Sequence, residues 1–330
     1  MKVAVFSTKP HDRKSLTEAA SEHEFVFFEN RLRPETASLA DGCRAVCVFV
    51  NDELDAATLR QLAAGGVELV TLRCAGFNNV DLAAAAEHGI RVMRVPEYSP
   101  HAVAEYCLAL LLAANRHIHK AYSRVREGNF ELKGLLGFDL HGKTVGVVGT
   151  GRIGRIFCRL LRGFGCRILA YDPYPHQEAI ELGARYVPLG QLLSESHVIT
   201  LHCPLTPETH HLIDDAALAR CRDGVLLVNT SRGGLVDTEA VIRHLKSRKI
   251  GGLALDVYEE ESGIFFENLS DEVIDDDVLM RLMTFPNVLV TSHQAFFTAE
   301  ALANITRVTL GNLDAFSRGD AGNATEVGSR

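Results

Sequence analysis

The sequence has no excess of positive charge, no long apolar run and no closely paired cysteines, and each absence excludes a class of function. The chain carries 34 Lys and Arg residues against 42 Asp and Glu residues, a formal net charge of −8. This balance argues against nucleic acid or an anionic membrane surface as a partner. The longest apolar run, CLALLLAA at 107–114, is well short of the roughly 18–20 residues that a membrane span needs.

The spacing of the cysteines and histidines gives no indication of a disulfide framework or a metal site. None of the eight cysteines forms a C-x-x-C pair, and most lie in apolar runs such as RAVCVFV. We therefore expect free buried thiols in a reducing compartment, hence a cytoplasmic protein. The start, MKVAVFSTKPHD, lacks the basic segment and long apolar stretch of a signal peptide. The pairs His117/His119 and His210/His211 have no evident partners at metal-ligand spacing, so we expect no metal site.

What is present is a regular alternation of strand-like and helix-like segments. A chain of 330 residues, 47% hydrophobic and 23% charged, is typical of a soluble protein with two domains. Strand-like runs separated by helical patterns favour parallel sheets covered by helices on both faces. The alternation occurs twice, which predicts an α/β protein with two doubly wound units. The expected strands are VAVFS, FVFFE, AVCVFV, VELVTLRCAG and IRVMRV, and then TVGVVG, RILAYD, HVITLHC, GVLLVNT, IGGLALDVY and NVLVTSH.

Three segments lie outside this alternation. After PEYSP, a long apolar helix is expected over 101–130, and its apolar residues predict burial at a domain or subunit interface, hence a homodimer or homotetramer. The last helix, TAEALANITRVTLGNLDAFSRG, is a candidate to return to the first unit. The final dozen residues, GDAGNATEVGSR, are polar and are expected to fray.

A glycine-rich turn is the first feature that points to a ligand. Gly149, Gly151 and Gly154 fit G-x-G-x-x-G between the strand TVGVV and a helix with apolar residues at spacings of 3 and 4. The first glycine permits a tight turn, the second lets backbone approach a pyrophosphate, and the third lets helix and strand pack closely. The helix N-terminus then offers free N–H groups to the anion.

An acidic residue at the end of the next strand narrows the choice of ligand. Asp172 closes RILAYD, 18 residues after Gly154. A carboxylate there accepts hydrogen bonds from ribose hydroxyls and repels a 2′-phosphate, so the pair of features favours NAD over NADP. The alternative is an ordinary acid at a strand end.

Three later strand ends carry residues suited to chemistry on a carbonyl acid. Arg232 follows the apolar strand GVLLVNT, Glu261 follows LALDVY, and His293 ends NVLVTSH. Ligands of doubly wound folds bind at the carboxyl ends of the strands. A guanidinium suits a carboxylate, and a histidine suits proton transfer. Taken singly, Arg232 could cap a helix, Glu261 is one of a row of acids, and His293 could be a loop histidine.

These motifs together resemble the D-isomer-specific 2-hydroxyacid dehydrogenases. The resemblance covers almost the whole chain and rests on VVGTGRIG, LHCPLTPETHHLID, VNTSRGGLVD, LDVYEEE and TSHQAFFT. The stretch RCAGFNNVDL and the insert SGIFFENLSDEVIDDDVLMRLM are most similar to the fermentative D-lactate dehydrogenase branch. The resemblance implies a flavodoxin-like substrate domain at 1–100 and 298–330 and a Rossmann NAD-binding domain at 101–297. It also implies a cleft between them, with joints near 98–103 and 295–300.

Residue roles follow from the resemblance, motif by motif. Arg232 is expected to bind the substrate carboxylate and polarise the carbonyl, His293 to act as acid/base, and Glu261 to pair with His293. The remaining residues fall into two groups. Substrate contacts are implied for Ala75, Gly76, Tyr98 and Phe296, and cofactor contacts for Gly149, Gly151, Arg152, Ile153, Gly154, Asp172, Cys203, Pro204, Thr230 and Asp256, the last also supporting the active site.

The implied reaction is reduction of pyruvate to D-lactate by hydride transfer from NADH. A protonated His293 next to the carbonyl supplies a hydrogen bond and a proton, and a neighbouring carboxylate favours its charged form. Two alternatives remain at this point: the same chemistry on a bulkier 2-ketoacid, of the 2-hydroxyisocaproate or phenyllactate type, or an NAD-sensing corepressor-like module. The corepressors carry a tryptophan near the nicotinamide, and this chain has none.

Overall fold

The chain forms two compact α/β units in a computed structural model that describes residues 1–320 and 325–328. The first unit comprises Met1–Ser99 with Phe297–Arg330, and the second comprises Pro100–Phe296. Both boundaries lie one residue before those expected from the sequence. The chain therefore leaves the first unit once, completes the second, and returns with its last long helix.

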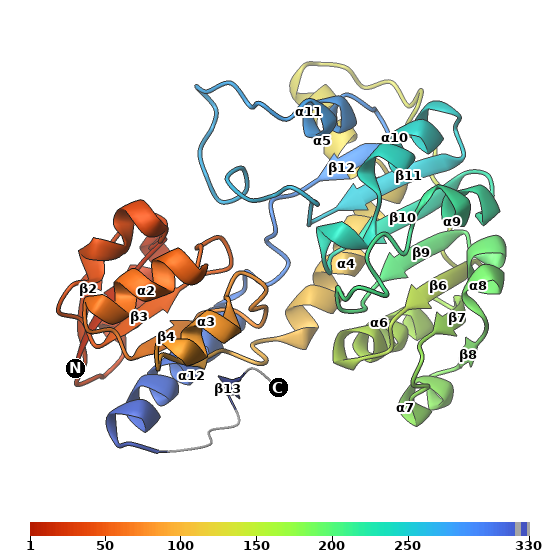
Figure 1. The fold of residues 1–330 in the computed structure, drawn as a ribbon. Helices are drawn as coiled ribbons and strands as arrows, with labels where there is room; N and C mark the ends of the chain where they lie inside the picture. Colours follow the sequence, from red (N-terminus) through yellow and green to blue (C-terminus); the bar gives the residue numbers. More distant parts are fainter. Residues whose placement is uncertain (321–324, 329–330) are drawn as a thin grey trace. The chain divides into compact units, whose positions relative to one another are not determined.

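The first unit is built on a sheet with the strand order β13-β5-β4-β3-β1-β2 (Figure 1). Five strands are parallel and follow the 2-1-3-4-5 order of flavodoxin-like folds. They are β1 (Lys2–Val5), β2 (Glu24–Phe27), β3 (Ala45–Val48), β4 (Leu69–Leu72) and β5 (Arg91–Met93). The helical segments are α1 (Pro10–Glu18), η1 (Pro34–Ala40), α2 (Ala56–Ala64), α3 (Leu82–Glu87) and α12 (Ala299–Ser317). The parallel sheet predicted for this unit is confirmed.

The sixth strand corrects the prediction that the C-terminal segment frays. Strand β13 (Glu326–Val327) pairs antiparallel with β5, Glu326 opposite Met93. The Arg91 guanidinium donates to both carboxylate oxygens of Glu326, at 3.0 Å and 2.7 Å. A polar sequence does not predict such a strand. The strand is stabilised by pairing with the edge of the sheet and by a bidentate ion pair, and neither is visible in the sequence. The rest of the predicted frayed segment, 321–324 and 329–330, lies outside the described residues.

The second unit is a fully parallel seven-stranded sheet in the order β12-β11-β10-β9-β6-β7-β8. This is the Rossmann order, in which the direction of strand addition reverses between β6 and β9. The strands are β6 (Thr144–Val148), β7 (Arg167–Tyr171), β8 (Ala184–Tyr186), β9 (Val198–Leu201), β10 (Val225–Asn229), β11 (Ile250–Leu255) and β12 (Val288–Val290). Strand β8 was not predicted, because three residues centred on a charged arginine carry no apolar pattern.

Helices cover both faces of this sheet. They are α4 (Pro100–Asn115), α5 (Ile118–Arg126), α6 (Arg152–Gly163), α7 (Gln177–Glu181), α8 (Leu189–Glu195), α9 (Asp215–Arg220), α10 (Thr238–Lys246) and α11 (Asp277–Met283), with a short turn η2 (Gly233–Leu235). Alternate residues of β10 enter opposite cores. Val225 and Leu227 pack with α8, α9 and α10, whereas Leu226 and Val228 pack with α4 and α6.

The single long helix expected over 101–130 is two helices. His117 has a φ of 52°, in the left-handed region, and separates α4 from α5. In α4, Ala104, Cys107 and Leu111 are buried in the core formed with α6 and the sheet. The packing inside one unit thus accounts for much of the apolar pattern that suggested a subunit interface. Within 1–320 and 325–328, no helix combines the length and apolarity needed to cross a membrane.

Candidate active site

The glycine turn lies where β6 meets α6, at the point where the strand order reverses. Gly149 has a φ of 92°, and a Cβ atom there would lie 2.6 Å from the amide nitrogen of Cys203. A Cβ atom on Gly154 would lie 2.1 Å from the carbonyl oxygen of Gly149. Both positions therefore require glycine. A Cβ atom on Gly151 would meet no other heavy atom within 4 Å, so the backbone stays open to a ligand on that side.

A partly buried histidine that the sequence did not single out, His202, supports this turn, and its Nε2 atom is buried. The ring of His202 packs on Phe157 with 5.0 Å between ring centroids. Burial lowers the pKa of His202 to about 3. The ring is therefore neutral and contributes shape without charge next to an anion site. No sequence motif distinguishes His202 from a solvent-exposed histidine.

The Asp172 carboxylate forms hydrogen bonds with Thr150 in the glycine turn. Its Oδ2 atom accepts hydrogen bonds from the backbone N–H of Thr150 at 2.6 Å and from the Thr150 hydroxyl at 3.0 Å. Its Oδ1 atom accepts from the backbone N–H of Tyr174 at 2.9 Å. The Tyr186 hydroxyl donates to the Thr150 oxygen at 2.7 Å. Thr150 and Tyr186 were not predicted; the position of Thr150 inside the motif was the only signal.

Arg232 follows β10, as predicted, and hydrogen bonds hold its backbone. The Asn229 amide donates to the carbonyl oxygen of Arg232 at 2.8 Å, and the Ser231 N–H donates to the Asn229 amide oxygen at 3.0 Å. The Ser231 hydroxyl donates to the carbonyl oxygen of Cys203 at 2.7 Å. The loop after β10 is thereby joined to the loop after β9, and the Arg232 side chain extends from a fixed backbone.

Glu261 and His293 come together although 32 residues separate them. His293 Nδ1 and Glu261 Oε1 are 2.7 Å apart, and the side chains are 17% and 23% exposed. The backbone N–H of Tyr258 donates to Glu261 Oε2 at 3.1 Å and so orients the carboxylate. Because Nδ1 is engaged by Glu261, Nε2 is the ring nitrogen left to face a ligand. This is the geometry of an acid/base histidine oriented by a carboxylate.

Asp256 shapes the segment that carries His293. The Asp256 carboxylate accepts hydrogen bonds from the Thr291 hydroxyl at 2.6 Å and from the N–H groups of Gln294 and Ala295 at 2.9 Å and 2.8 Å. His293 has a φ of 52°, and its N–H donates to the Asp256 carbonyl oxygen at 2.6 Å. Burial raises the pKa of Asp256, and these hydrogen bonds oppose the rise. The contacts fit the expected supporting role.

The other predicted residues of the second unit differ in exposure and in their contacts. Arg152 opens α6 and is exposed, and Ile153 packs partly into the core behind the turn. The Pro204 carbonyl accepts from the Thr209 hydroxyl at 2.7 Å. Thr230 and Phe296 are buried, with 6% and 9% of their surface exposed.

In the first unit, hydrogen bonds hold the backbone of all three predicted substrate residues. The Arg94 guanidinium donates to the carbonyl oxygen of Ala75 at 2.5 Å, and the Cys74 thiol donates to that of Gly76 at 3.2 Å. The Asn304 amide of α12 donates to the carbonyl oxygen of Tyr98 at 2.8 Å. Ala75 and Gly76 follow β4 in the chain, and Tyr98 follows β5.

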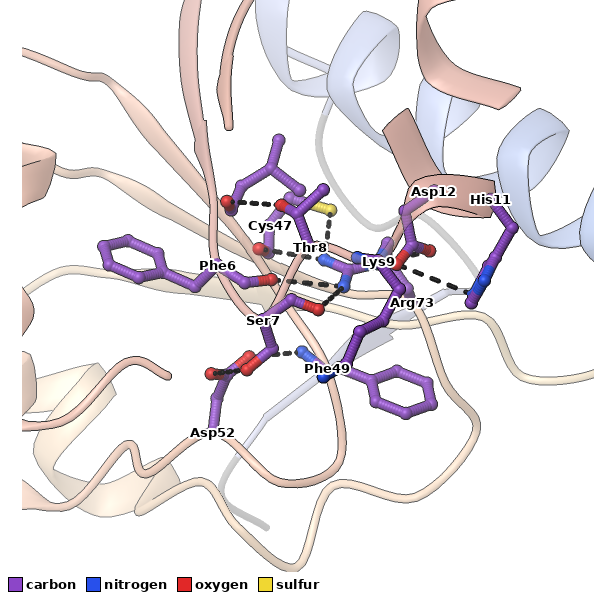
Figure 2. Close-up of polar contacts among 11 residues, drawn as sticks. Phe6, Ser7, Thr8, Lys9, His11, Asp12, Cys47, Phe49, Asp52 and Arg73 are labelled. Atoms are coloured by element: carbon purple, nitrogen blue, oxygen red, sulfur yellow. Dashed lines mark hydrogen bonds and ion pairs between the residues drawn. The ribbon is translucent and has the colours of Figure 1, made fainter. Parts of the chain in front are cut away.

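The residue before this segment, Arg73, is the centre of a buried network (Figure 2). Its side chain is 3% exposed, and its Nε atom lies 3.3 Å from an Asp12 carboxylate oxygen. The guanidinium donates to the carbonyl oxygens of Cys47 and Phe6, each at 3.2 Å. Burial alone lowers the pKa of Arg73, but the charge of Asp12 reverses this and raises it. Arg73 thus links the ends of β1, β3 and β4, a role that the sequence did not reveal.

We expect Arg73→Met to lower the stability of the chain strongly. Removing one partner of a buried ion pair costs about 3–5 kcal/mol, because Asp12 loses its cation and the carbonyl oxygens of Phe6 and Cys47 lose a buried donor. The matched control is Arg44→Met, whose pair with Glu68 is more than half exposed (52% and 53%) and worth about 0–1 kcal/mol. Urea unfolding of both variants is the measurement. Equal loss in the two variants would remove Arg73 from this role.

Comparison with known proteins identifies the family of the chain. The family profile described as "D-isomer specific 2-hydroxyacid dehydrogenase, NAD binding domain" matches residues 108–295. The chain is 53% identical to D-lactate dehydrogenase of Escherichia coli over 322 residues, 97% of this chain and 98% of that one. It is 55% identical to a 2-hydroxyacid dehydrogenase homolog of Haemophilus influenzae over 315 residues, 95% of each chain.

A solved structure gives the same result for the fold. The apo structure of D-lactate dehydrogenase from Escherichia coli superposes with a TM-score of 0.91 at 50% identity, covering 99% of this chain and all of that one. The resemblance inferred from the motifs and the expected NAD cofactor are both confirmed. The chain belongs to the D-isomer-specific 2-hydroxyacid dehydrogenase family, and its second unit contains that family's NAD-binding domain.

Proposed function

We propose that this protein is an NAD-dependent D-lactate dehydrogenase that reduces pyruvate to D-lactate. The observation that carries the proposal is the Glu261–His293 pair, 2.7 Å apart, in the same unit as Arg232 and the glycine turn. A carboxylate-oriented histidine and a guanidinium at strand ends suit reduction of a 2-ketoacid. Two relatives of more than 50% identity are named for this class of reaction.

The cofactor site follows from the residues around the glycine turn. Gly149, Gly151 and Gly154, with Arg152, would hold the pyrophosphate at the N-terminus of α6. Asp172 would accept hydrogen bonds from the adenosine ribose. Ile153, Cys203, Pro204, Thr230 and Asp256 would line or support the remaining length of the dinucleotide. When bound, NADH supplies the hydride.

The protein's own residues bind the acid and deliver the proton. In the second unit, Arg232 would bind the pyruvate carboxylate and polarise the carbonyl, and Phe296 would contact the substrate. The family resemblance assigns substrate contacts in the first unit to the backbone N–H groups of Ala75 and Gly76 and to Tyr98. His293 would give its Nε2 proton to the carbonyl oxygen as the carbonyl carbon is reduced, and the product would be D-lactate. Arg232 and His293 face charge that grows toward the transition state, so they act more strongly there than on bound pyruvate.

A single set of assays tests the proposal. NAD-linked oxidation of D-lactate but not L-lactate is expected, with NADH-linked reduction of pyruvate. Values of kcat/KM for pyruvate, 2-ketoisocaproate and phenylpyruvate then measure substrate size preference. If either larger acid gave the higher kcat/KM, the proposed substrate would be a bulkier 2-ketoacid instead of pyruvate, and the proposed reaction would stay the same. Activity on L-lactate alone would overturn the proposal.

We expect Asp172→Ala to relax discrimination against NADPH. The carboxylate repels a 2′-phosphate and accepts hydrogen bonds from the ribose, so its loss weakens NADH binding and removes the repulsion. The ratio of kcat/KM for NADH to that for NADPH should fall about tenfold or more, equivalent to ~1.4 kcal/mol. Asp172 also accepts hydrogen bonds from Thr150, so Asp172→Asn serves as the variant that keeps an acceptor. An unchanged ratio in both variants would exclude Asp172 as the ribose ligand.

The proposal extends to assembly and location. A homodimer or homotetramer is proposed, which light scattering of the purified protein tests. All eight cysteines are free thiols, which supports the proposed cytoplasmic location.

A further inference from the structure

We propose that His210, His211 and Glu259 form a binding site for a divalent metal ion of the zinc type. One ligand atom from each of the three side chains lies within 4.8 Å of the other two. Imidazole nitrogen and carboxylate oxygen are ligands that zinc accepts, and two histidines with one glutamate form a three-ligand set that leaves a coordination position open. The three residues are separate from Arg232, Glu261 and His293.

Backbone contacts bring the three residues together. The N–H of His211 donates to the carbonyl oxygen of Gly234 at 2.8 Å, and His211 has a φ of 51°, in the left-handed region. A Cβ atom on Gly233 would lie 2.1 Å from the carbonyl group of Tyr258, so the backbone before Glu259 packs directly on this glycine. The segments that carry the ligands are thus held on the same turn, so that only the His210 side chain must move to complete the site.

The contacts of Glu259 resemble those of a metal-binding carboxylate. Its Oε2 atom accepts a hydrogen bond from the Thr238 hydroxyl at 3.2 Å, and its Oε1 atom pairs closely with His211 Nε2. Outer hydrogen bonds of this kind orient metal ligands. A bound ion would lie between His211 Nε2 and Glu259 Oε1 and take the place of their direct contact.

His210 completes the set by a side-chain rotation. Its ring is stacked on that of His211, with 3.9 Å between centroids and 23° between planes. Stacked rings direct their nitrogen lone pairs side by side, so His210 must turn about its side-chain bonds to reach the same ion. His210 is exposed, which permits the rotation. The side chains of His211 and Glu259 are 34% and 23% exposed, so the ion can enter from solvent.

The site is close in sequence to the catalytic glutamate of the proposed reaction. Glu259 follows Tyr258, whose backbone N–H donates to the Glu261 carboxylate at 3.1 Å. An ion held by Glu259 and by the loop of His210 and His211 would restrain the backbone that presents Glu261. The binding proposal itself does not depend on the reaction, because metal affinity is measured without substrate.

The experiment is a zinc titration of the full chain after chelator treatment, by calorimetry, with Co²⁺ absorption in the visible region as a second reading. One zinc ion per chain and a Co²⁺ spectrum of imidazole and carboxylate ligation are expected. The decisive variant is His210→Gln, because His210 is exposed and its loss should leave the fold intact by circular dichroism. It should weaken zinc binding about 10–100-fold, at least the loss seen when an outer-shell partner is removed.

Two further variants complete the design. Glu259→Gln should weaken binding as His210→Gln does. His176→Asn removes another exposed histidine of the second unit but keeps an acceptor for the Glu178 N–H that His176 Nδ1 caps, and it should bind zinc as the parent does. Absence of a stoichiometric zinc site in the parent, or zinc binding by His210→Gln as tight as the parent's, would overturn the proposal. A thiolate band in the Co²⁺ spectrum, from cysteine ligation, would overturn it as well.

Discussion

Replacing Arg232 by alanine is expected to lower kcat/KM for pyruvate by about 10³-fold, since one preorganised donor to developing charge is worth about 10²–10³ in rate and carboxylate binding is lost as well. KM for pyruvate should rise and kcat should fall together. The dissociation constant for NADH should change little, because the Arg232 side chain extends from the loop after β10 and not from the glycine turn.

A lysine at this position separates charge from geometry. Arg232→Lys keeps the positive charge but loses the planar pair of donors that matches a carboxylate. We expect it to recover part of the lost kcat/KM and to leave KM for pyruvate above that of the parent. The measurements are steady-state kinetics with pyruvate and titration of NADH fluorescence. If Arg232→Ala kept the parent's kcat/KM for pyruvate, Arg232 would not be the residue that binds the substrate carboxylate.

The second large effect is expected for Glu261→Gln. His293 Nδ1 lies 2.7 Å from Glu261 Oε1, so the variant removes the charge that favours the protonated ring and the acceptor that orients it. The corresponding change of an orienting carboxylate to an amide in serine proteases lowers kcat about 10⁴-fold, and we expect a loss of about 10²–10⁴-fold here. Reduction of pyruvate should fall because the ring loses the acceptor that directs its Nε2 atom toward the carbonyl oxygen.

The adjacent acid provides a matched control for this variant. Glu260 is exposed and lies in the same row of glutamates, so Glu260→Gln removes the same charge one residue away. Its kcat should be that of the parent. The measurement is kcat for pyruvate reduction in the parent and both variants. If Glu261→Gln kept the parent's kcat, Glu261 would not be the partner of His293.

Much of the second unit was predictable because its signals are local. The glycine spacing of G-x-G-x-x-G predicts where the backbone needs glycine. The structure confirms a positive φ at Gly149 and a close contact at Gly154. Strand ends are also local, so Asp172, Arg232 and His293 could be placed at one edge of a parallel sheet before the sheet was seen. Residue pattern alone could not separate Glu261 from its neighbouring glutamates. The family resemblance assigned it to His293, and the structure gives the distance between the two side chains, 2.7 Å.

Other features depend on partners far away in the chain. The break at His117, the three-residue β8 and the antiparallel β13 have no periodic pattern of their own. The tail strand exists because β5 offers an edge and Arg91 offers a guanidinium to Glu326. A single long helix was the wrong prediction for 101–130, since apolar periodicity continues past a residue whose left-handed conformation ends the helix.

The sequence by itself determined the two α/β units, the dinucleotide turn and the residue types available for hydride-transfer chemistry. Each of these depends on neighbouring residues in the chain, through strand and helix periodicity or through the conformations that only glycine allows. The tertiary structure alone supplied the 2.7 Å contact between Glu261 and His293, the hydrogen bonds by which Asp256 holds the His293 segment, and the pairing of Arg73 with Asp12 inside the first unit. It also placed Glu259 beside His210 and His211, 48 residues from the latter. The physical reason is common to all four: a side chain's role depends on the charges and donors that packing brings within about 3 Å of it, as in a hydrogen bond, and sequence spacing does not specify those neighbours.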